Sequence, residues 1–243
     1  KVEALQVNPA QGADPIATSS NGFYDPGLKL SDIEALPKEL QNKVNVRFAL
    51  GKTKRGKKTV EAQEFKVGGV YGEQLGNVVY WLKKAATYVE NERVEVEKDG
   101  VKKTRFEPNP QQKKALDDLI AFLETGDEQR FKDHSIAWLK TKSALDYLNG
   151  FYETYKDPRG IIGSYSASVS FRADSEAVEK LSQNALYFES KMPWKDAWKR
   201  AKVDPPGASV VNVLVGIGDS GPVSYAAFNL PNYDQIRKEH GSK

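Results

Sequence analysis

The sequence has no cysteine and only two histidines among its 243 residues. Without cysteine the chain cannot form disulfides, thiolate metal sites or a cysteine nucleophile. The two histidines, His134 and His240, are too few and too distant in the sequence for a three-histidine zinc site. No acidic loop has the tight spacing that calcium or magnesium sites need. The residues of this chain therefore predict no metal site within it.

The sequence also lacks a hydrophobic run of about 20 residues, so it predicts no membrane span. Lys and Arg number 36 against 33 Asp and Glu, and this small excess indicates no polyanionic partner. The basic stretch 51–58 has no aromatic residues for stacking bases, so we interpret it as a solvated hairpin tip and expect no nucleic-acid binding. No signal-peptide pattern follows Lys1, which is typical of a processed chain or a piece of a longer protein, and both cytoplasm and bacterial periplasm remain open.

With 39% hydrophobic residues, the chain can bury the core of one large or two modest domains. Periodicity and turn residues predict an irregular order of elements. Helices are expected near 31–36 and over 72–92, 110–125, 128–139 and 174–189, and strands over 44–50, 59–67, 165–171, 209–215 and 223–230. Residues 95–106 are expected to form a hairpin that turns at Asp99-Gly100. Because helices and strands do not alternate regularly, the predicted fold class is α+β.

The stretch 143–157 separates into an apolar and an acidic face when read at a period of 3.6, so we expect a helix that Pro158 ends. The apolar stripe consists of Leu145, Leu148, Tyr152 and Tyr155, and the opposite stripe of Asp146, Asn149, Glu153 and Asp157. The three carboxylates would repel one another unless a cation or a bound ammonium group lay among them. The alternative interpretation is a solvated helix face opposite a core stripe.

The segment Gly216–Gly221 matches the dinucleotide-binding fingerprint, but Pro222 and a β-like sequence follow where a helix would have to begin. An oxidoreductase would need that helix. The overlapping Gly218–Pro222 matches the nucleophile loop of trypsin-like serine proteases, but the strand-rich double barrel that such a loop requires is not predicted. We interpret the segment as a tight glycine turn between strands.

Two segments carry a more specific pattern: Asn149-Gly-Phe-x-Glu153-x-Tyr155-x-Asp157-Pro158 and Phe228-Asn229-Leu-Pro231-Asn232-Tyr-Asp234. Together they resemble the dipeptidyl peptidase III family of zinc exopeptidases, and most closely its Bacteroidetes-type branch. Residues 67–71, 79–85 and 237–243 resemble further parts of the same pattern. The resemblance runs from about residue 60 to the C-terminus.

The resemblance implies a two-lobed peptidase of which this chain is a fragment. The family's metal motif, His-Glu-x-x-Gly-His, lies beyond the second segment, and this chain stops before it. Zinc would therefore belong to the complete enzyme, with ligands in a missing C-terminal part that is the chain's partner. The implied domains are an extended arm over 1–40, a mixed lobe with a β-barrel-like sheet over 41–165, helices crossing to the helical lobe over 166–204, and return strands of the mixed lobe over 205–243.

The resemblance also implies where a short peptide would bind. In the family the substrate is added as a strand along the segment that matches Ser224–Asn232, and an exposed strand edge pairs with any extended peptide through its backbone. The implied substrate-binding residues are Asp146, Asn149, Glu153, Ser224, Tyr225, Phe228, Asn229, Asn232 and Asp234. Among these, Asp146 matches the ligand of the substrate ammonium group, and Asp234 another subsite carboxylate. No catalytic residue is expected within this chain.

The predicted function is the peptide-binding part of a dipeptidyl peptidase III-like hydrolase, a zinc metallopeptidase and aminopeptidase that releases dipeptides from peptide N-termini. The alternative is a non-catalytic peptide-binding or structural protein built on a degenerate peptidase lobe. Asn229 and Asn232 would then be ordinary turn and cap residues. An intact metal motif in the missing part separates these two hypotheses.

Overall fold

The computed structural model describes residues 12–20, 22–53, 55–90, 92–98, 100–141, 143–173, 175–203, 208–221 and 225–243. The chain divides into two compact units. The first comprises Lys1–Thr141 with Asn149–Ser166, and the second comprises Lys142–Leu148 with Ala167–Lys243. The boundary falls within two neighbouring strands, so each of these strands contributes residues to both units.

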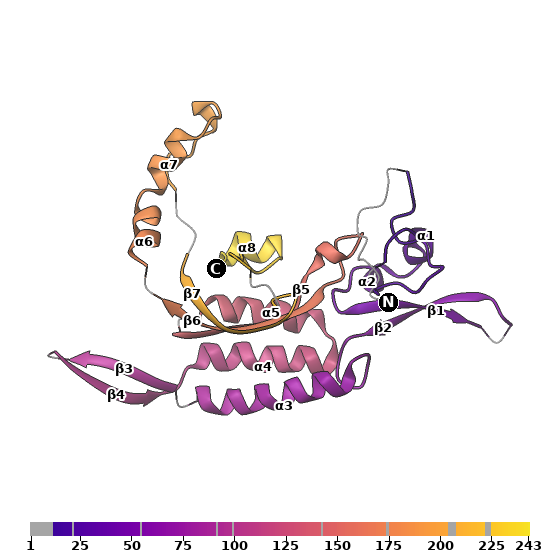
Figure 1. Ribbon diagram of the computed structural model, residues 1–243, viewed down its shortest axis with the longest axis horizontal. Coiled ribbons are helices and arrows are strands. Elements are labelled where there is room, and N and C mark those ends of the chain that lie inside the picture. Colours follow the sequence, from indigo (N-terminus) through magenta and orange to yellow (C-terminus); the bar gives the residue numbers. More distant parts are fainter. Residues whose placement is uncertain are drawn as a thin grey trace. The chain divides into compact units, whose positions relative to one another are not determined.

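The core of the first unit is a layer of three helices, α3 (Gly72–Val89), α4 (Pro110–Thr125) and α5 (Glu128–Leu139). Helix α4 packs against both α3 and α5, and Figure 1 shows it between them. The rings of Phe122 and Phe131, both fully buried, stack with centroids 4.6 Å apart. The buried apolar faces of α4 and α5 therefore meet in the core of the unit.

The ends of α4 follow from local sequence. The side chain of Asn109 accepts a hydrogen bond from the backbone N–H of Gln112 at 3.1 Å, and Pro110 occupies the first helical turn. Gly126 ends the helix with a left-handed φ of 75°. Both helix boundaries predicted from these residues are confirmed.

Two antiparallel hairpins accompany the helices. Strands β1 (Val46–Lys52) and β2 (Lys58–Glu64) form the first, and β3 (Glu92–Lys98) and β4 (Val101–Glu107) form the second. The basic stretch 51–58 lies at the tip of the first hairpin, as expected. The short helices α1 (Leu30–Glu34) and α2 (Lys38–Gln41) precede it.

The prediction of a helix over 143–157 is wrong. This stretch forms strand β5 (Leu145–Glu153) and a single 3-10 turn, η1 (Thr154–Lys156). A period of 3.6 fits its apolar residues, but its three aromatic residues are of a type enriched in strands, so the stretch also suits an extended backbone. Pairing with the next strand along the chain, β6 (Ser164–Ala173), decides between the two conformations.

Two glycines allow close contacts around β5. A Cβ atom at Gly150 would lie 2.6 Å from ring carbons of Phe131 on α5. A Cβ atom at Gly163 would lie 2.2 Å from the backbone oxygen of Phe151. Real Cβ atoms do not approach other atoms so closely, so both positions require glycine.

The second unit contains the rest of a three-stranded sheet of order β5-β6-β7, in which β7 spans Val210–Gly218. Its helices are α6 (Glu176–Gln183), α7 (Ala185–Lys191) and α8 (Asp234–His240), together with the turn η2 (Asp196–Trp198). The α+β class is confirmed, although the sheets formed by the described residues do not close into a barrel. Within the part of the chain that the structure describes, none of the helices combines the length and hydrophobicity that a membrane span needs.

Two further expectations for the second unit change. The helix expected up to residue 189 is divided into α6 and α7, with Ser175 as the N-cap of α6, while Asp174 lies outside the described residues. The strand expected over 223–230 is wrong for residues 225–230, which form no strand. The sequence Phe228-Asn-Leu-Pro supports little sheet pairing, since proline has no N–H to donate and asparagine is disfavoured in strands.

The loop after η1 is organised by the carboxylate of Asp157, which is only 3% exposed. It accepts hydrogen bonds from the Tyr24 hydroxyl at 2.7 Å and from the backbone N–H groups of Arg159, Ile161 and Ile162 at 3.1, 3.0 and 2.8 Å. Burial, followed by the charge of Asp157, raises the pKa of Tyr24, so this hydroxyl stays protonated and donates. Asp157 therefore joins the N-terminal region to this loop.

We expect Asp157→Ala to lower the free energy of unfolding by about 3 kcal/mol, because it leaves several buried donors without their acceptor. The matched control is Asp117→Ala, which removes an exposed carboxylate paired with Lys113 and is expected to cost about 0.5 kcal/mol. Urea denaturation of both variants measures the difference. Equal losses would contradict the assigned role of Asp157.

Candidate functional site

In the first unit, β5 carries two of the expected site residues, Asn149 and Glu153. They are four residues apart in a strand, so their side chains point to the same side. The Tyr165 hydroxyl donates to Asn149 Oδ1 at 3.1 Å, and burial raises the pKa of this tyrosine. The Ser164 hydroxyl donates to the backbone oxygen of Glu153 at 3.0 Å. Residues of β6 therefore hold both positions.

Asp146 does not share that side of the strand. Side chains alternate along β5, so Asp146 is directed opposite to Asn149 and Glu153. The acidic helix face expected over 143–157 thus does not exist: one carboxylate lies on each side of β5, and Asp157 is buried in the loop that follows.

In the second unit, Asp146 is the centre of an ion cluster. Its carboxylate lies 3.0 Å from Arg172 Nη2 and 3.2 Å from Lys243 Nζ. The side chains of Asp146 and Lys243 are only 13% and 15% exposed. Burial lowers the pKa of Lys243 to about 8, against the opposing attraction of Asp146. Two cations therefore already compensate the carboxylate that was expected to bind the substrate ammonium group.

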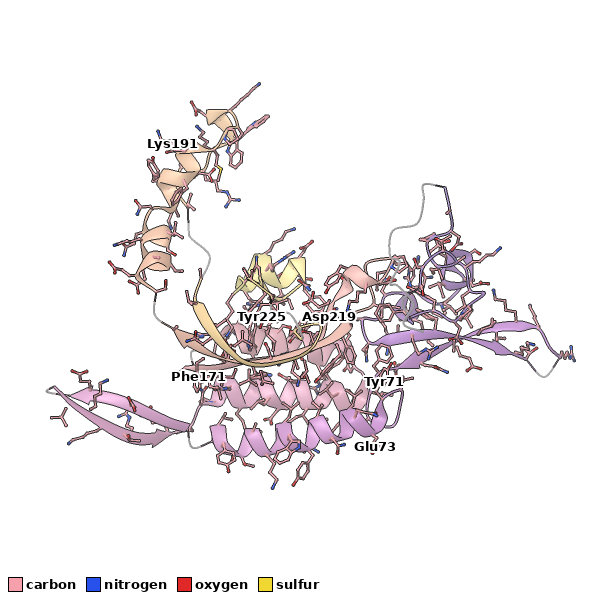
Figure 2. All side chains as sticks on the ribbon, in the orientation of Figure 1. Tyr71, Glu73, Phe171, Lys191, Asp219 and Tyr225 are labelled. Carbon is pink, nitrogen blue, oxygen red and sulfur yellow. The ribbon has the colours of Figure 1, made fainter. Side chains whose placement is uncertain are left out.

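The segment 225–232, which precedes α8, is held at both ends. Near its start, the Tyr225 hydroxyl (Tyr225 is labelled in Figure 2) lies 2.8 Å from the Ser168 hydroxyl on β6. The Tyr225 ring also meets Phe228 edge-on, with centroids 5.1 Å apart. Near its end, the Leu230 N–H donates to the Lys243 backbone oxygen at 3.0 Å, and the Lys243 N–H donates back to Leu230 at 3.1 Å.

At the end of this segment, two buried residues lie between two exposed ones. Leu230 and Pro231 are buried and are joined by a cis peptide bond, while Asn229 and Asn232 on either side are exposed. The buried pair thus fixes the backbone and leaves both asparagine side chains on the surface.

Of the remaining expected residues, Asp234 is the first residue of α8 and pairs with Arg237, whose guanidinium lowers the pKa of this carboxyl. Ser224 lies outside the described residues.

Sequence reasoning missed a cavity of about 390 Å³ in the first unit. Its walls are mainly apolar and include the aromatic residues Phe23, Phe65, Tyr71, Phe151 and Tyr165. The rings of Phe65 and Phe151 lie 5.3 Å apart, and those of Phe151 and Tyr165 lie 5.6 Å apart. Tyr71 (labelled in Figure 2) is the N-cap residue of α3 and has an unusual positive φ of 59°. These rings come from four separate parts of the chain, so no sequence motif could have indicated the cavity.

Comparison with known proteins identifies the family. Residues 31–243 match Peptidase family M49. The chain belongs to this family. The chain is 27% identical over 243 residues to dipeptidyl peptidase 3 of Dictyostelium discoideum. This alignment covers 91% of the chain and 32% of that protein. The chain is 30% identical over 141 residues to dipeptidyl peptidase 3 of Nematostella vectensis, covering 57% of this chain and 19% of that protein.

Solved structures share the fold of the M49 chain. Dipeptidyl peptidase III from Caldithrix abyssi matches with a TM-score of 0.68 and 23% identity, covering 96% of this chain and 41% of that chain. The enzyme from Corallococcus sp. strain EGB matches with a TM-score of 0.63 and 20% identity, covering 96% of this chain and 40% of that chain. The M49 chain therefore spans less than half the length of these relatives, and the resemblance to the dipeptidyl peptidase III family is confirmed.

In the part of the chain that the structure describes, the donors do not fit a zinc ion. Among the described residues there is no group of three or more histidine, aspartate or glutamate side chains that could hold a metal. His134 is buried, and its Nδ1 donates to the Ala115 backbone oxygen at 2.8 Å. His240 lies at the end of α8 beside Glu239.

We expect Tyr225→Phe to destabilise the M49 chain by about 1 kcal/mol, the usual net contribution of one hydrogen bond, which lowers Tm by about 2–4 °C in a protein of this size. Tyr187→Phe, on the exposed surface of α7, is the control and should leave Tm unchanged. Thermal unfolding measures both. Adding Ser168→Ala to Tyr225→Phe should cost little more, because both variants remove the same bond; fully additive losses would show that the two hydroxyls do not interact.

Proposed function

We propose that the M49 chain is the peptide-binding part of a dipeptidyl peptidase III-like exopeptidase, which releases dipeptides from the N-termini of short peptides. The observation that carries this proposal is the presentation of Asn229 and Asn232 around the buried Leu230 and Pro231. An amide side chain can both donate and accept, so two of them on a fixed backbone suit an extended peptide main chain. Family membership supports the same assignment.

Binding through the main chain explains how such a site accepts many sequences. Residues 225–229 belong to none of the described sheets, so a peptide can lie along them without displacing a strand. Backbone pairing supplies affinity that does not depend on side chains, while the two asparagines set the register of the peptide. Tyr225 and Phe228 add an apolar surface beside this path.

An exopeptidase must also recognise a free amino terminus. A carboxylate binds an ammonium group through charge-assisted hydrogen bonds. We assign this role to Glu153, with Asn149 on the same side of β5, and we assign Asp234 to a further subsite. Asp146 is a weaker candidate for direct contact, because Arg172 and Lys243 already compensate its charge.

Zinc and its chemistry belong to the complete enzyme in this proposal. Because the described residues hold no group that fits the ion, we assign its ligands to the part of the enzyme outside this sequence, which is the expected partner of the chain. This chain contributes substrate binding and orientation to the reaction.

The experiment is to purify the full gene product without chelator and to determine its mass, zinc content and hydrolysis of a dipeptidyl-naphthylamide. We expect stoichiometric zinc and dipeptide release. A natural product of 27.0 kDa without metal or activity would contradict the proposal and leave a non-catalytic peptide-binding or structural protein.

We expect Asn229→Ala and Asn232→Ala each to lower kcat/KM of the full gene product by roughly ten-fold, the effect of losing one to two hydrogen bonds to substrate. Both side chains are exposed, so thermal stability should change little. Asn77→Ala, an exposed asparagine of α3, is the matched control. Unchanged kinetics for both site variants would contradict the assignment of residues 225–232 to peptide binding.

A further inference from the structure

Lys243 contacts the proposed peptide segment through its backbone. Its N–H and C=O groups both pair with Leu230, at 3.1 and 3.0 Å, which makes a two-way bridge between residues 13 positions apart. Leu230 stands directly after Asn229 and one residue before the buried Pro231. Any displacement of Lys243 therefore moves the backbone from which the two asparagines project.

The side chain of Lys243 is fixed at a different place. Its Nζ lies 3.2 Å from Asp146 Oδ2 on β5, and the same oxygen lies 3.0 Å from Arg172 Nη2 on β6. The Arg172 N–H also donates to the Ala144 backbone oxygen at 2.8 Å, so the start of β5 and the end of β6 are themselves tied together. Lys243 thus connects the segment 225–232 to the sheet.

We propose that Lys243 is a positioning residue for peptide binding, which holds Asn229 and Asn232 in register through Leu230 while Asp146 and Arg172 hold its own side chain. The inference rests on the proposed function of the 225–232 segment. It also gives Asp146 a role without contact to substrate: the carboxylate keeps the lysine ammonium in place.

The charges around Lys243 make this contact sensitive to pH. The groups that act on it are Asp146, whose charge favours the protonated lysine, and Arg172, whose charge disfavours it. Burial, with a smaller contribution from Arg172, lowers the pKa of Lys243 to about 8 against the opposing effect of Asp146. Above this pH the ion pair with Asp146 is lost, while Asp146 keeps Arg172 as its partner.

Protein stability changes in the opposite direction over the same range. Because the pKa of Lys243 is lower in the folded than in the unfolded chain, the unfolded chain binds more protons between about pH 8 and the ordinary lysine value of about 10.4. This group therefore makes stability rise with pH over that window. A loss of peptide affinity there cannot come from unfolding caused by Lys243.

The test uses the full gene product and a dipeptidyl-naphthylamide, with KM and kcat measured from pH 6.5 to 9.5. For the wild type we expect KM to rise above about pH 8 with a smaller change in kcat. Lys243→Met should raise KM roughly ten-fold at pH 7 and reduce the alkaline rise in KM to the part that comes from the substrate's own amino group, which has an ordinary pKa of about 8. Lys243→Arg, which stays charged, should keep most of the affinity of the wild type and show a smaller alkaline rise in KM than the wild type.

Lys238→Met is the matched control, since Lys238 is an exposed lysine on α8, and its pH profile should equal that of the wild type. An unchanged KM in Lys243→Met, or the same alkaline rise in Lys243→Arg, would overturn the inference. If Lys243→Met does not fold, the variants Lys243→Arg and Asp146→Asn test the inference instead. Asp146→Asn should raise KM at pH 7 by as much as is expected for Lys243→Met. If the wild type releases no dipeptide, both the proposed function and this inference are wrong. If the enzyme is active and its KM does not depend on Lys243, only the inference is wrong.

Discussion

The arrangement of the first unit depends on the close approach of strand β5 to helix α5. Gly150 lies so near the Phe131 ring that no side chain fits between them, and this contact places the whole strand on the helical layer. The neighbouring Phe151 then joins Phe65 and Phe122 in the aromatic core. Because alternation along a strand is fixed, seating Gly150 also sets which side of β5 Asn149 and Glu153 occupy.

In the second unit, an ion cluster helps to fix the positions of the candidate site residues. Leu230 and Pro231 are buried, and Asn229 and Asn232 on either side are exposed. The ion cluster of Asp146, Arg172 and Lys243 holds the backbone of this segment in place. A buried ion pair adds little net stability, because desolvation offsets most of the attraction. Its value here lies in geometry: a defined lysine position keeps two exposed side chains in register.

The elements with local signals could be predicted from the sequence. The cap at Asn109, the stop at Gly126 and the two hairpins depend on neighbouring residues, and the structure confirms them. The stretch 143–157 could not be predicted in this way, because an apolar pattern of that length fits both a helix and a strand and only pairing with β6 decides.

For the candidate site too, some features could be predicted from the sequence and others could not. The resemblance gave Asn229 and Asn232, which lie three positions apart in one motif. It could not give the contacts that hold them, since Tyr225 meets Ser168 across 57 residues and Lys243 meets Asp146 across nearly 100. Such pairs are set by tertiary packing, for which a single sequence carries no local signal.

The most direct test of the account is hydrogen–deuterium exchange on the full gene product with a peptide that it binds but does not cleave. The account predicts slower exchange of amides within residues 225–232, and no change in the hairpin Glu92–Glu107, which lies outside the proposed site. Slower exchange confined to the hairpin or to the helices, with 225–232 unaffected, would contradict the claim that this segment binds the peptide.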